Sequence, residues 1–122
     1  MIKKFLYLLS ILTILPAFSG DYEKSISNDE NVLLYLYTNN CNYCVKFDPI
    51  FDKLQEKFSN NCKFLKVDIT STYGTELMHK FNAYYVPYVI LYNNNKRIMH
   101  TIVPTCLINY ACAKDAIEKF IN

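Results

Sequence analysis

The stretch that decides the fold is residues 32–44, VLLYLYTNNCNYC, which runs from an apolar segment into a pair of cysteines. Residues 32–37 are apolar on both alternating faces, which predicts a central strand buried on each side. The polar residues 38–40 predict a turn, and helical spacing of apolar residues begins directly after the cysteines. The stretch therefore predicts a strand, a turn and a helix that carries Cys41 and Cys44 at its start.

This placement of the two cysteines predicts thiol chemistry. A helix N-terminus offers unpaired N–H groups and a partial positive charge, which stabilise a thiolate over a thiol. We expect Cys41 to be the nucleophile and Cys44, one turn further in, to resolve the mixed disulfide formed at Cys41. Val86 and Pro87 lead into another apolar run further along the chain. Together these features indicate thiol–disulfide exchange.

The rest of the pattern predicts an α/β protein whose sheet mixes parallel and antiparallel pairs. Strands are expected at residues 32–37, 63–69, 88–92 and 97–103, and later helices at residues 75–81 and 107–121. The helix after the cysteines contains Pro49, which is expected to kink it. Its inward face is predicted to carry Phe47, Ile50, Phe51, Leu54 and Phe58. The inward positions predicted for the last helix are Ile108, Ala111, Ala116, Ile117, Phe120 and Ile121.

Three segments of the chain resemble thioredoxin-fold oxidoreductases. Residues 41–54, CNYCVKFDPIFDKL, resemble the active-site helix of that family, in which a proline follows the second cysteine by five residues. Residues 64–68, FLKVD, resemble the next strand, and residues 86–88, VPY, resemble the cis-proline loop. The likeness covers residues 30–122. It implies a thioredoxin fold, with a central mixed sheet flanked by helices, and a thiol–disulfide oxidoreductase.

The resemblance also implies roles for residues near the cysteines. Cys41 and Cys44 would be the catalytic pair and would form the redox disulfide. Pro87 would be cis, so that the backbone of Val86 faces the cysteines and pairs with an extended client segment. Tyr43, Val86 and Pro87 are therefore the expected substrate-binding residues. Protein thiols and disulfides are the expected clients, and a redox partner protein would recycle the site. No cofactor and no metal are implied.

The departures from the family pattern are informative. Many thioredoxins have a tryptophan before the first cysteine and Gly-Pro between the two, where this chain has Asn40 and Asn42-Tyr43. They also bury an aspartate six residues before the first cysteine, and that position is Tyr35 here. The likeness therefore favours an exported thioredoxin-like protein over a housekeeping thioredoxin.

The first nineteen residues are predicted to be a secretory signal peptide. Lys3 and Lys4 give a basic start, residues 5–15 are largely apolar, and cleavage is expected before Gly20. The protein would then be exported, to a periplasm or another extracytoplasmic space, with a thioredoxin-like domain at residues 20–122. If the segment is instead retained, it would anchor the protein in a membrane.

The charge balance gives no support for nucleic-acid binding. The formal net charge is +2, which Lys3 and Lys4 alone account for, so residues 20–122 are neutral overall. A nucleic-acid-binding domain is expected to carry a basic patch and a basic balance.

Five cysteines leave at least one thiol without a partner inside the chain. Cys106 and Cys112 are six residues apart, which in a regular helix separates their Cα atoms by about 9 Å. A disulfide needs less than about 7 Å, so they pair only if residues 105–109 form a loop or a broken turn. Cys62 would then be the odd thiol.

Two other interpretations of the cysteines remain open at this point. The Cys41–Cys44 pair is also compatible with half of a structural zinc site, completed by Cys62, Cys106, Cys112, His79 or His100. Alternatively, the pair is an inert structural bridge in a thioredoxin-fold binding or chaperone-like module.

Overall fold

The computed structural model describes residues 30–122. The predicted signal peptide at residues 1–19, and the start of the domain at residue 20, lie outside the described residues. None of the helices within residues 30–122 is both long and apolar enough to cross a membrane.

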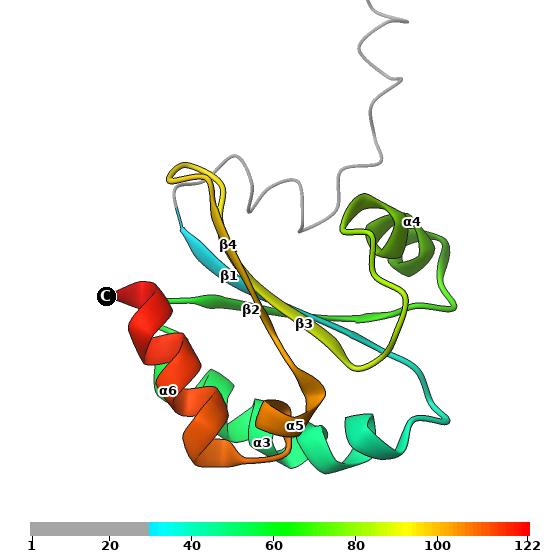
Figure 1. Cartoon of the computed structure of the whole chain (residues 1–122), viewed down its shortest axis with the longest axis horizontal. Helices are drawn as coiled ribbons and strands as arrows, with labels where there is room; N and C mark the ends of the chain where they lie inside the picture. Colours follow the sequence, from blue (N-terminus) through cyan, green and yellow to red (C-terminus); the bar gives the residue numbers. More distant parts are fainter. Residues whose placement is uncertain (1–29) are drawn as a thin grey trace, which may run out of the picture.

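A mixed four-stranded sheet forms the centre of the molecule, in the order β2-β1-β3-β4 (Figure 1). The central strand β1 pairs in parallel with β2 and antiparallel with β3, and β3 pairs antiparallel with β4. The strands are β1 (Asn31–Tyr37), β2 (Lys63–Asp68), β3 (Tyr88–Asn93) and β4 (Ile98–Ile102). This is the α/β mixed sheet flanked by helices that the sequence predicts.

The helices cover both faces of the sheet. They are α3 (Asn42–Phe58), α4 (Thr72–Lys80), α5 (Pro104–Leu107) and α6 (Tyr110–Ile121). In Figure 1, α3, α5 and α6 lie on one side of the sheet and α4 on the other. Alternate residues of β1 enter two separate core clusters, with Leu33 and Tyr35 facing α3 and with Leu34 and Leu36 facing α4. The strand β1 is apolar on both faces because each face is buried in one of these two clusters.

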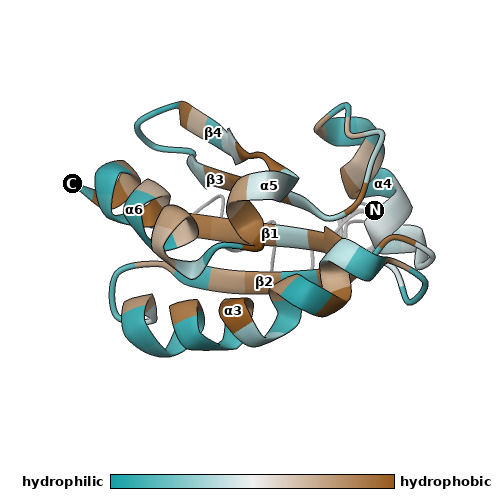
Figure 2. Cartoon of the chain, turned by 60° about the horizontal axis from the view of Figure 1, so that its bottom comes forward, coloured by the Kyte–Doolittle hydropathy of each residue, from teal (hydrophilic) through white to brown (hydrophobic). Residues whose placement is uncertain are grey.

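The helix α3 is held by one apolar face. Its buried residues after Cys44 are Phe47, Phe51, Leu54 and Phe58, which recur at three- and four-residue spacing. Ile50, the remaining predicted inward position, is partly buried against the same cluster. Figure 2 shows apolar residues along the central strands and alternating polar and apolar segments on α3. Pro49 lies within this helix on its exposed side.

The last helical region differs from the single helix predicted. Residues 104–121 form two helices, because α5 ends at Leu107 and Asn109 caps a new helix by accepting a hydrogen bond from the Cys112 N–H at 3.1 Å. The break resets the helical phase, so Ala113 is fully buried and Ala111 is exposed. The predicted inward position at Ala111 was therefore wrong, whereas Ile117 is buried as expected.

The helix α4 begins three residues earlier than predicted. Ser71 is its N-cap, and the Ser71 hydroxyl accepts a hydrogen bond from the Gly74 N–H at 2.9 Å. Gly74 packs so closely on the end of β2 that a Cβ atom there would collide with the Asp68 carbonyl oxygen. A glycine is required at this position because the obstacle is backbone, which a side chain cannot displace cheaply.

Candidate active site

The topology brings two loops together at one end of the sheet. The chain leaves β1 after Tyr37 and reaches Cys41 four residues later. Leu36, near the end of β1, pairs with Tyr88, the first residue of the antiparallel strand β3. The loop before β3, which contains Val86 and Pro87, therefore starts from the same edge of the sheet as the loop that carries Cys41. Figure 1 shows α3 starting at the end of β1.

Cys41 and Cys44 form a disulfide at the start of α3, with their Cα atoms 5.1 Å apart. Cys41 is the N-cap of the helix, with extended backbone angles, and its sulfur accepts a hydrogen bond from the Cys44 N–H at 3.1 Å. Cys44 is 2% exposed, whereas Cys41 is half-buried. The more accessible sulfur thus sits at the tip of the helix and its partner lies one turn deeper.

The electrostatics at this helix start favour a thiolate on Cys41. The first turn consists of Asn42, Tyr43, Cys44 and Val45, so no carboxylate within it offsets the positive end of the helix dipole. Lys46 follows directly, and its Nζ lies 5.5 Å from the centre of the Tyr43 ring. The positive end of a helix dipole stabilises a thiolate over a thiol at the N-cap position.

The predicted substrate-binding residues lie around this pair. The Val86–Pro87 peptide bond is cis. Pro87 is buried, and Val86 packs against the core cluster that contains Cys44, as does Cys41. The ring of Tyr43 is exposed on the first turn of α3. The structure thus places Tyr43, Val86 and Pro87 at the same end of the sheet as the cysteines.

Tyr35 links the buried cysteine to a carboxylate that sequence reasoning missed. The Tyr35 hydroxyl lies 2.9 Å from Asp48 Oδ1 and 3.2 Å from the carbonyl oxygen of Cys44. Asp48 also pairs with Lys66, whose Nζ is 3.3 Å from Oδ1. Burial, and then the hydrogen bond to Asp48, raise the pKa of Tyr35 above its ordinary value. A buried tyrosine hydroxyl usually has a hydrogen-bond partner, so the burial predicted for residues 32–37 could have indicated a polar neighbour for Tyr35 without identifying it.

The second cysteine pair is also bonded. Cys106 lies in α5 and Cys112 in the first turn of α6, with their Cα atoms 5.3 Å apart. The break between the two helices shortens this distance from the 9 Å of a regular helix to within the disulfide limit. The disulfide therefore joins the two short helical segments that follow β4.

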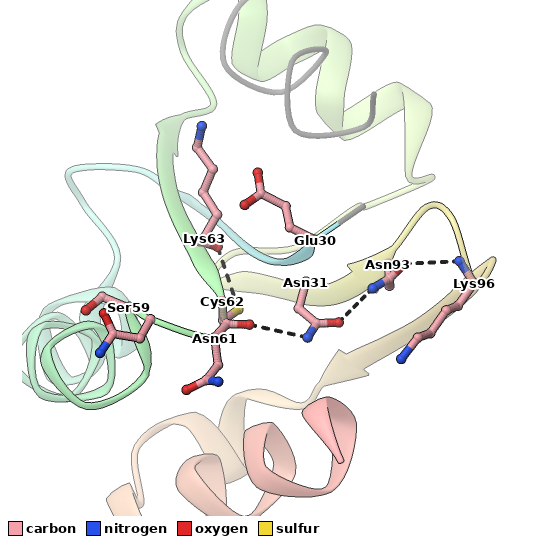
Figure 3. A pocket seen from close by; sticks show the side chains of 9 residues that line it. Glu30, Asn31, Ser59, Asn61, Cys62, Lys63, Asn93 and Lys96 are labelled. Atoms are coloured by element: carbon pink, nitrogen blue, oxygen red, sulfur yellow. Dashed lines mark hydrogen bonds between the residues drawn. The ribbon is translucent and has the colours of Figure 1, made fainter. Parts of the chain in front are cut away.

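Cys62 remains as the free thiol, and it lies at the opposite end of the sheet. It is 4% exposed, and its thiol donates a weak hydrogen bond to the Lys63 carbonyl oxygen at 3.7 Å. Burial is the main cause that raises the pKa of Cys62 to about 12. A cavity of about 520 Å³ adjoins it, lined by polar residues that include Asn31, Asn61 and Asn93 (Figure 3).

The zinc interpretation finds no support in this geometry. Four of the cysteines are joined in pairs, and within residues 30–122 no group of three or more histidine, cysteine or acidic side chains is arranged to hold a metal ion. His79 lies on α4 and His100 on β4, and both are exposed.

A protein-family model described as Thioredoxin matches residues 14–121. A thioredoxin of Borreliella burgdorferi is 37% identical over 51 residues, which are 42% of this chain. That match spans 44% of the length of the Borreliella protein.

Solved structures of thioredoxins share the fold of this chain. The oxidised thioredoxin from Plasmodium falciparum has a TM-score of 0.68 at 22% identity, covering 85% of this chain and 93% of the other. A thioredoxin from Malassezia sympodialis has a TM-score of 0.70 at 19% identity, covering 85% and 89%. At such identities the likeness establishes the architecture.

Proposed function

The chain belongs to the thioredoxin family, and we propose that it is a thiol–disulfide oxidoreductase that exchanges disulfides with protein clients through Cys41 and Cys44. The observation that carries the proposal is the Cys41–Cys44 disulfide at the start of α3, with one half-buried sulfur at the helix tip and one buried sulfur behind it. This arrangement fits attack at the first sulfur and resolution by the second.

Exchange proceeds through two successive thiolate attacks, each on one sulfur of a disulfide. The Cys41 thiolate attacks one sulfur of a client disulfide, which forms a mixed disulfide and releases the other client sulfur as a thiolate. Cys44 then loses its proton and attacks the Cys41 sulfur, so the Cys41–Cys44 bond forms and the second client thiolate leaves. Two electrons pass from the dithiol to the client, and the reverse sequence oxidises a client dithiol.

Client binding is assigned to the residues beside the cysteines. The backbone of Val86 would pair with an extended client segment, as in strand addition, with Pro87 holding the loop. The exposed ring of Tyr43 would contact apolar client side chains. A separate redox protein would return the Cys41–Cys44 pair to its starting state after each cycle.

Export to a periplasm or another extracytoplasmic space is part of the proposal. The basic and apolar start of the chain supports it, and so does the Cys106–Cys112 disulfide, because structural disulfides persist mainly in oxidising compartments. N-terminal sequencing of the protein recovered from outside the cytosol is expected to begin at Gly20. A protein found there with Met1 intact would instead indicate a retained anchor.

Insulin reduction with dithiothreitol as electron source tests the exchange activity. We expect Cys41→Ser to abolish the acceleration that the wild-type protein gives, and Cys62→Ser to leave it unchanged. The alternative, a binding or chaperone-like module with an inert bridge, predicts no acceleration by the wild-type protein and no effect of Cys41→Ser. An acceleration that survives Cys41→Ser would contradict the assignment of the nucleophile.

A further inference from the structure

The Cys44 thiol faces a problem of proton release. Its sulfur must become a thiolate before it can attack Cys41, yet the residue is 2% exposed and belongs to an apolar core cluster. Bulk water therefore has little direct access to the proton. A buried thiol in apolar surroundings is otherwise inert, so resolution at neutral pH requires a polar group nearby.

The Tyr35 hydroxyl is a polar group that contacts the backbone of Cys44. Tyr35 is fully buried on β1, and its single hydroxyl hydrogen lies between the Cys44 carbonyl oxygen at 3.2 Å and Asp48 Oδ1 at 2.9 Å. Its ring is clamped by Phe47 and Phe51, with centroids 4.8 and 5.3 Å away. The hydroxyl is therefore held in place between the peptide of the resolving cysteine and a carboxylate.

Asp48 connects this buried hydroxyl to solvent. It lies on α3 one turn after Cys44, with its side chain 42% exposed. Tyr35 from β1 and Lys66 from β2 contact the Asp48 carboxylate, and Tyr37 from β1 lies beside Lys66. Lys66 Nζ lies 3.3 Å from the carboxylate and 4.6 Å from the centre of the Tyr37 ring. On α3 itself, Asp52 follows one turn later and is exposed.

We propose that Tyr35 and Asp48 form a positioning pair that carries the proton of the Cys44 thiol toward solvent while the mixed disulfide is resolved. The proposal rests on the proposed exchange function. The Tyr35 hydroxyl takes the thiol proton and passes its own hydrogen to the Asp48 carboxylate, which releases it to water. The Cys44 thiolate then forms a bond to the Cys41 sulfur, and the client leaves as a thiolate.

The environment of Tyr35 suits it to relay the proton, which it accepts on its hydroxyl oxygen while it donates its own hydrogen to Asp48. Asp48, not Tyr35, is the base that finally holds the proton. Burial and the neighbouring carboxylate raise the pKa of Tyr35, so the phenol stays protonated and neutral while the proton moves through it. The carboxylate is the acceptor, and Lys66 holds it beside the phenol. Tyr35→Phe and Asp48→Asn each interrupt the route at one atom with little change of side-chain volume.

A two-phase reaction with 5,5′-dithiobis(2-nitrobenzoate) tests the proposal. Cys41 of the reduced protein releases the first thionitrobenzoate, and Cys44 releases the second when it resolves the mixed disulfide. Absorbance from stopped-flow mixing between pH 6 and pH 10 gives both rates. Cys44→Ser identifies the second phase by removing it, and Asp52→Asn is the matched control because it removes one carboxylate one turn away on the same helix.

We expect Asp48→Asn and Tyr35→Phe to slow the second phase at pH 7 by about 100-fold, the lower end of the range for general acid–base assistance. Their rates should approach the wild-type rate near pH 10, where hydroxide removes the proton directly. The first phase and the Asp52→Asn variant should be unchanged. A purely structural defect would instead lower the rate by the same factor at every pH.

The outcomes separate this proposal from the proposed function. A normal first phase with an unchanged, uniformly slowed or faster second phase in Asp48→Asn would overturn the positioning pair alone. A faster second phase would mean that the carboxylate only repels the Cys44 thiolate. Failure of the wild-type protein to release the first thionitrobenzoate would overturn the exchange function, and the positioning pair with it.

Discussion

The two ends of the sheet hold cysteines in opposite chemical states. At one end Cys41 caps α3, with N–H groups and a helix dipole directed at its sulfur. At the other end Cys62 precedes β2 in the core, and burial raises the pKa of its thiol to about 12. The same side chain is thus reactive or inert according to whether it starts a helix or is packed in the core beside a strand.

The surroundings of the two ends also differ, because the cysteine end exposes groups to solvent and the Cys62 end pairs its polar groups with one another. The cysteine end offers cis-proline backbone and exposed aromatic rings, which can meet a client. The Cys62 end is tied internally by asparagines. Asn31 Nδ2 donates to the Asn61 carbonyl oxygen at 3.3 Å, and Asn31 Oδ1 accepts from Asn93 Nδ2 at 2.9 Å. Asn93 Oδ1 in turn accepts from the Lys96 N–H at 3.0 Å (Figure 3). The cysteine end therefore exposes groups that a client can contact, whereas the hydrogen bonds at the Cys62 end join neighbouring strands and loops to one another.

The rate of alkylation by iodoacetamide is expected to differ most between the cysteines at the two ends. In the fully reduced protein at pH 7, iodoacetamide is expected to modify Cys41 at least about a thousand times faster than Cys62. The shift in the pKa of Cys62 from 9.0 to about 12 alone reduces its thiolate fraction by about that factor. Mass spectrometry of quenched time points measures both rates. Comparable rates would contradict the contrast between helix tip and core.

Removal of the buried asparagine should affect the Cys62 end alone. Asn93 is 3% exposed, and Asn93→Ala would remove the hydrogen bonds that it makes to Asn31 Oδ1 and to the Lys96 N–H. The free energy of unfolding should fall by about 1–2 kcal/mol, because each of the two lost hydrogen bonds contributes about 1 kcal/mol. Urea denaturation measures the change, with the exposed Asn95→Ala in the same turn as control. An equal loss of insulin-reducing activity would show that the two ends are coupled.

The smallest expected effect is that of alkaline pH on the free energy of unfolding, through the Cys62 thiol. The folded state raises the pKa of Cys62, so the thiol stabilises the fold fully below its ordinary pKa and progressively less as the pH rises toward 12. Between pH 8 and pH 9.5, the free energy of unfolding of the oxidised protein should fall by on the order of 1 kcal/mol more than that of Cys62→Ala. Urea melts at several pH values measure the difference. Parallel curves would indicate that the Cys62 thiol ionises in the folded protein.

The sequence predicted the elements whose apolar pattern is local. The central strand and the inward face of α3 follow from the spacing of apolar residues, and the start of α3 at the cysteines follows from the turn residues before it. The sequence predicted the Cys106–Cys112 disulfide only on the condition that the helix is interrupted between the two cysteines, and no glycine or proline marks that interruption. Asn109 makes that break by capping α6, and the shifted phase of Ala111 and Ala113 follows from it.

The polar link behind Cys44 was not predictable from local patterns. Tyr35, Asp48 and Lys66 come from β1, α3 and β2, and they meet only because the parallel pairing of β1 and β2 sets Tyr35 opposite Lys66. Helical spacing alone would place Asp48 one turn beyond Cys44. The register of the sheet is required to bring the phenol and the ammonium group to it.

The N-cap position of Cys41 has a practical consequence for every experiment on this site. Serine is among the preferred N-cap residues and alanine is not. A serine hydroxyl can therefore accept the Cys44 N–H in place of the sulfur and preserve the first turn of α3. An alanine would remove the nucleophile and fray the helix end together. The serine variant thus isolates the loss of a reactive atom from the loss of a folded element.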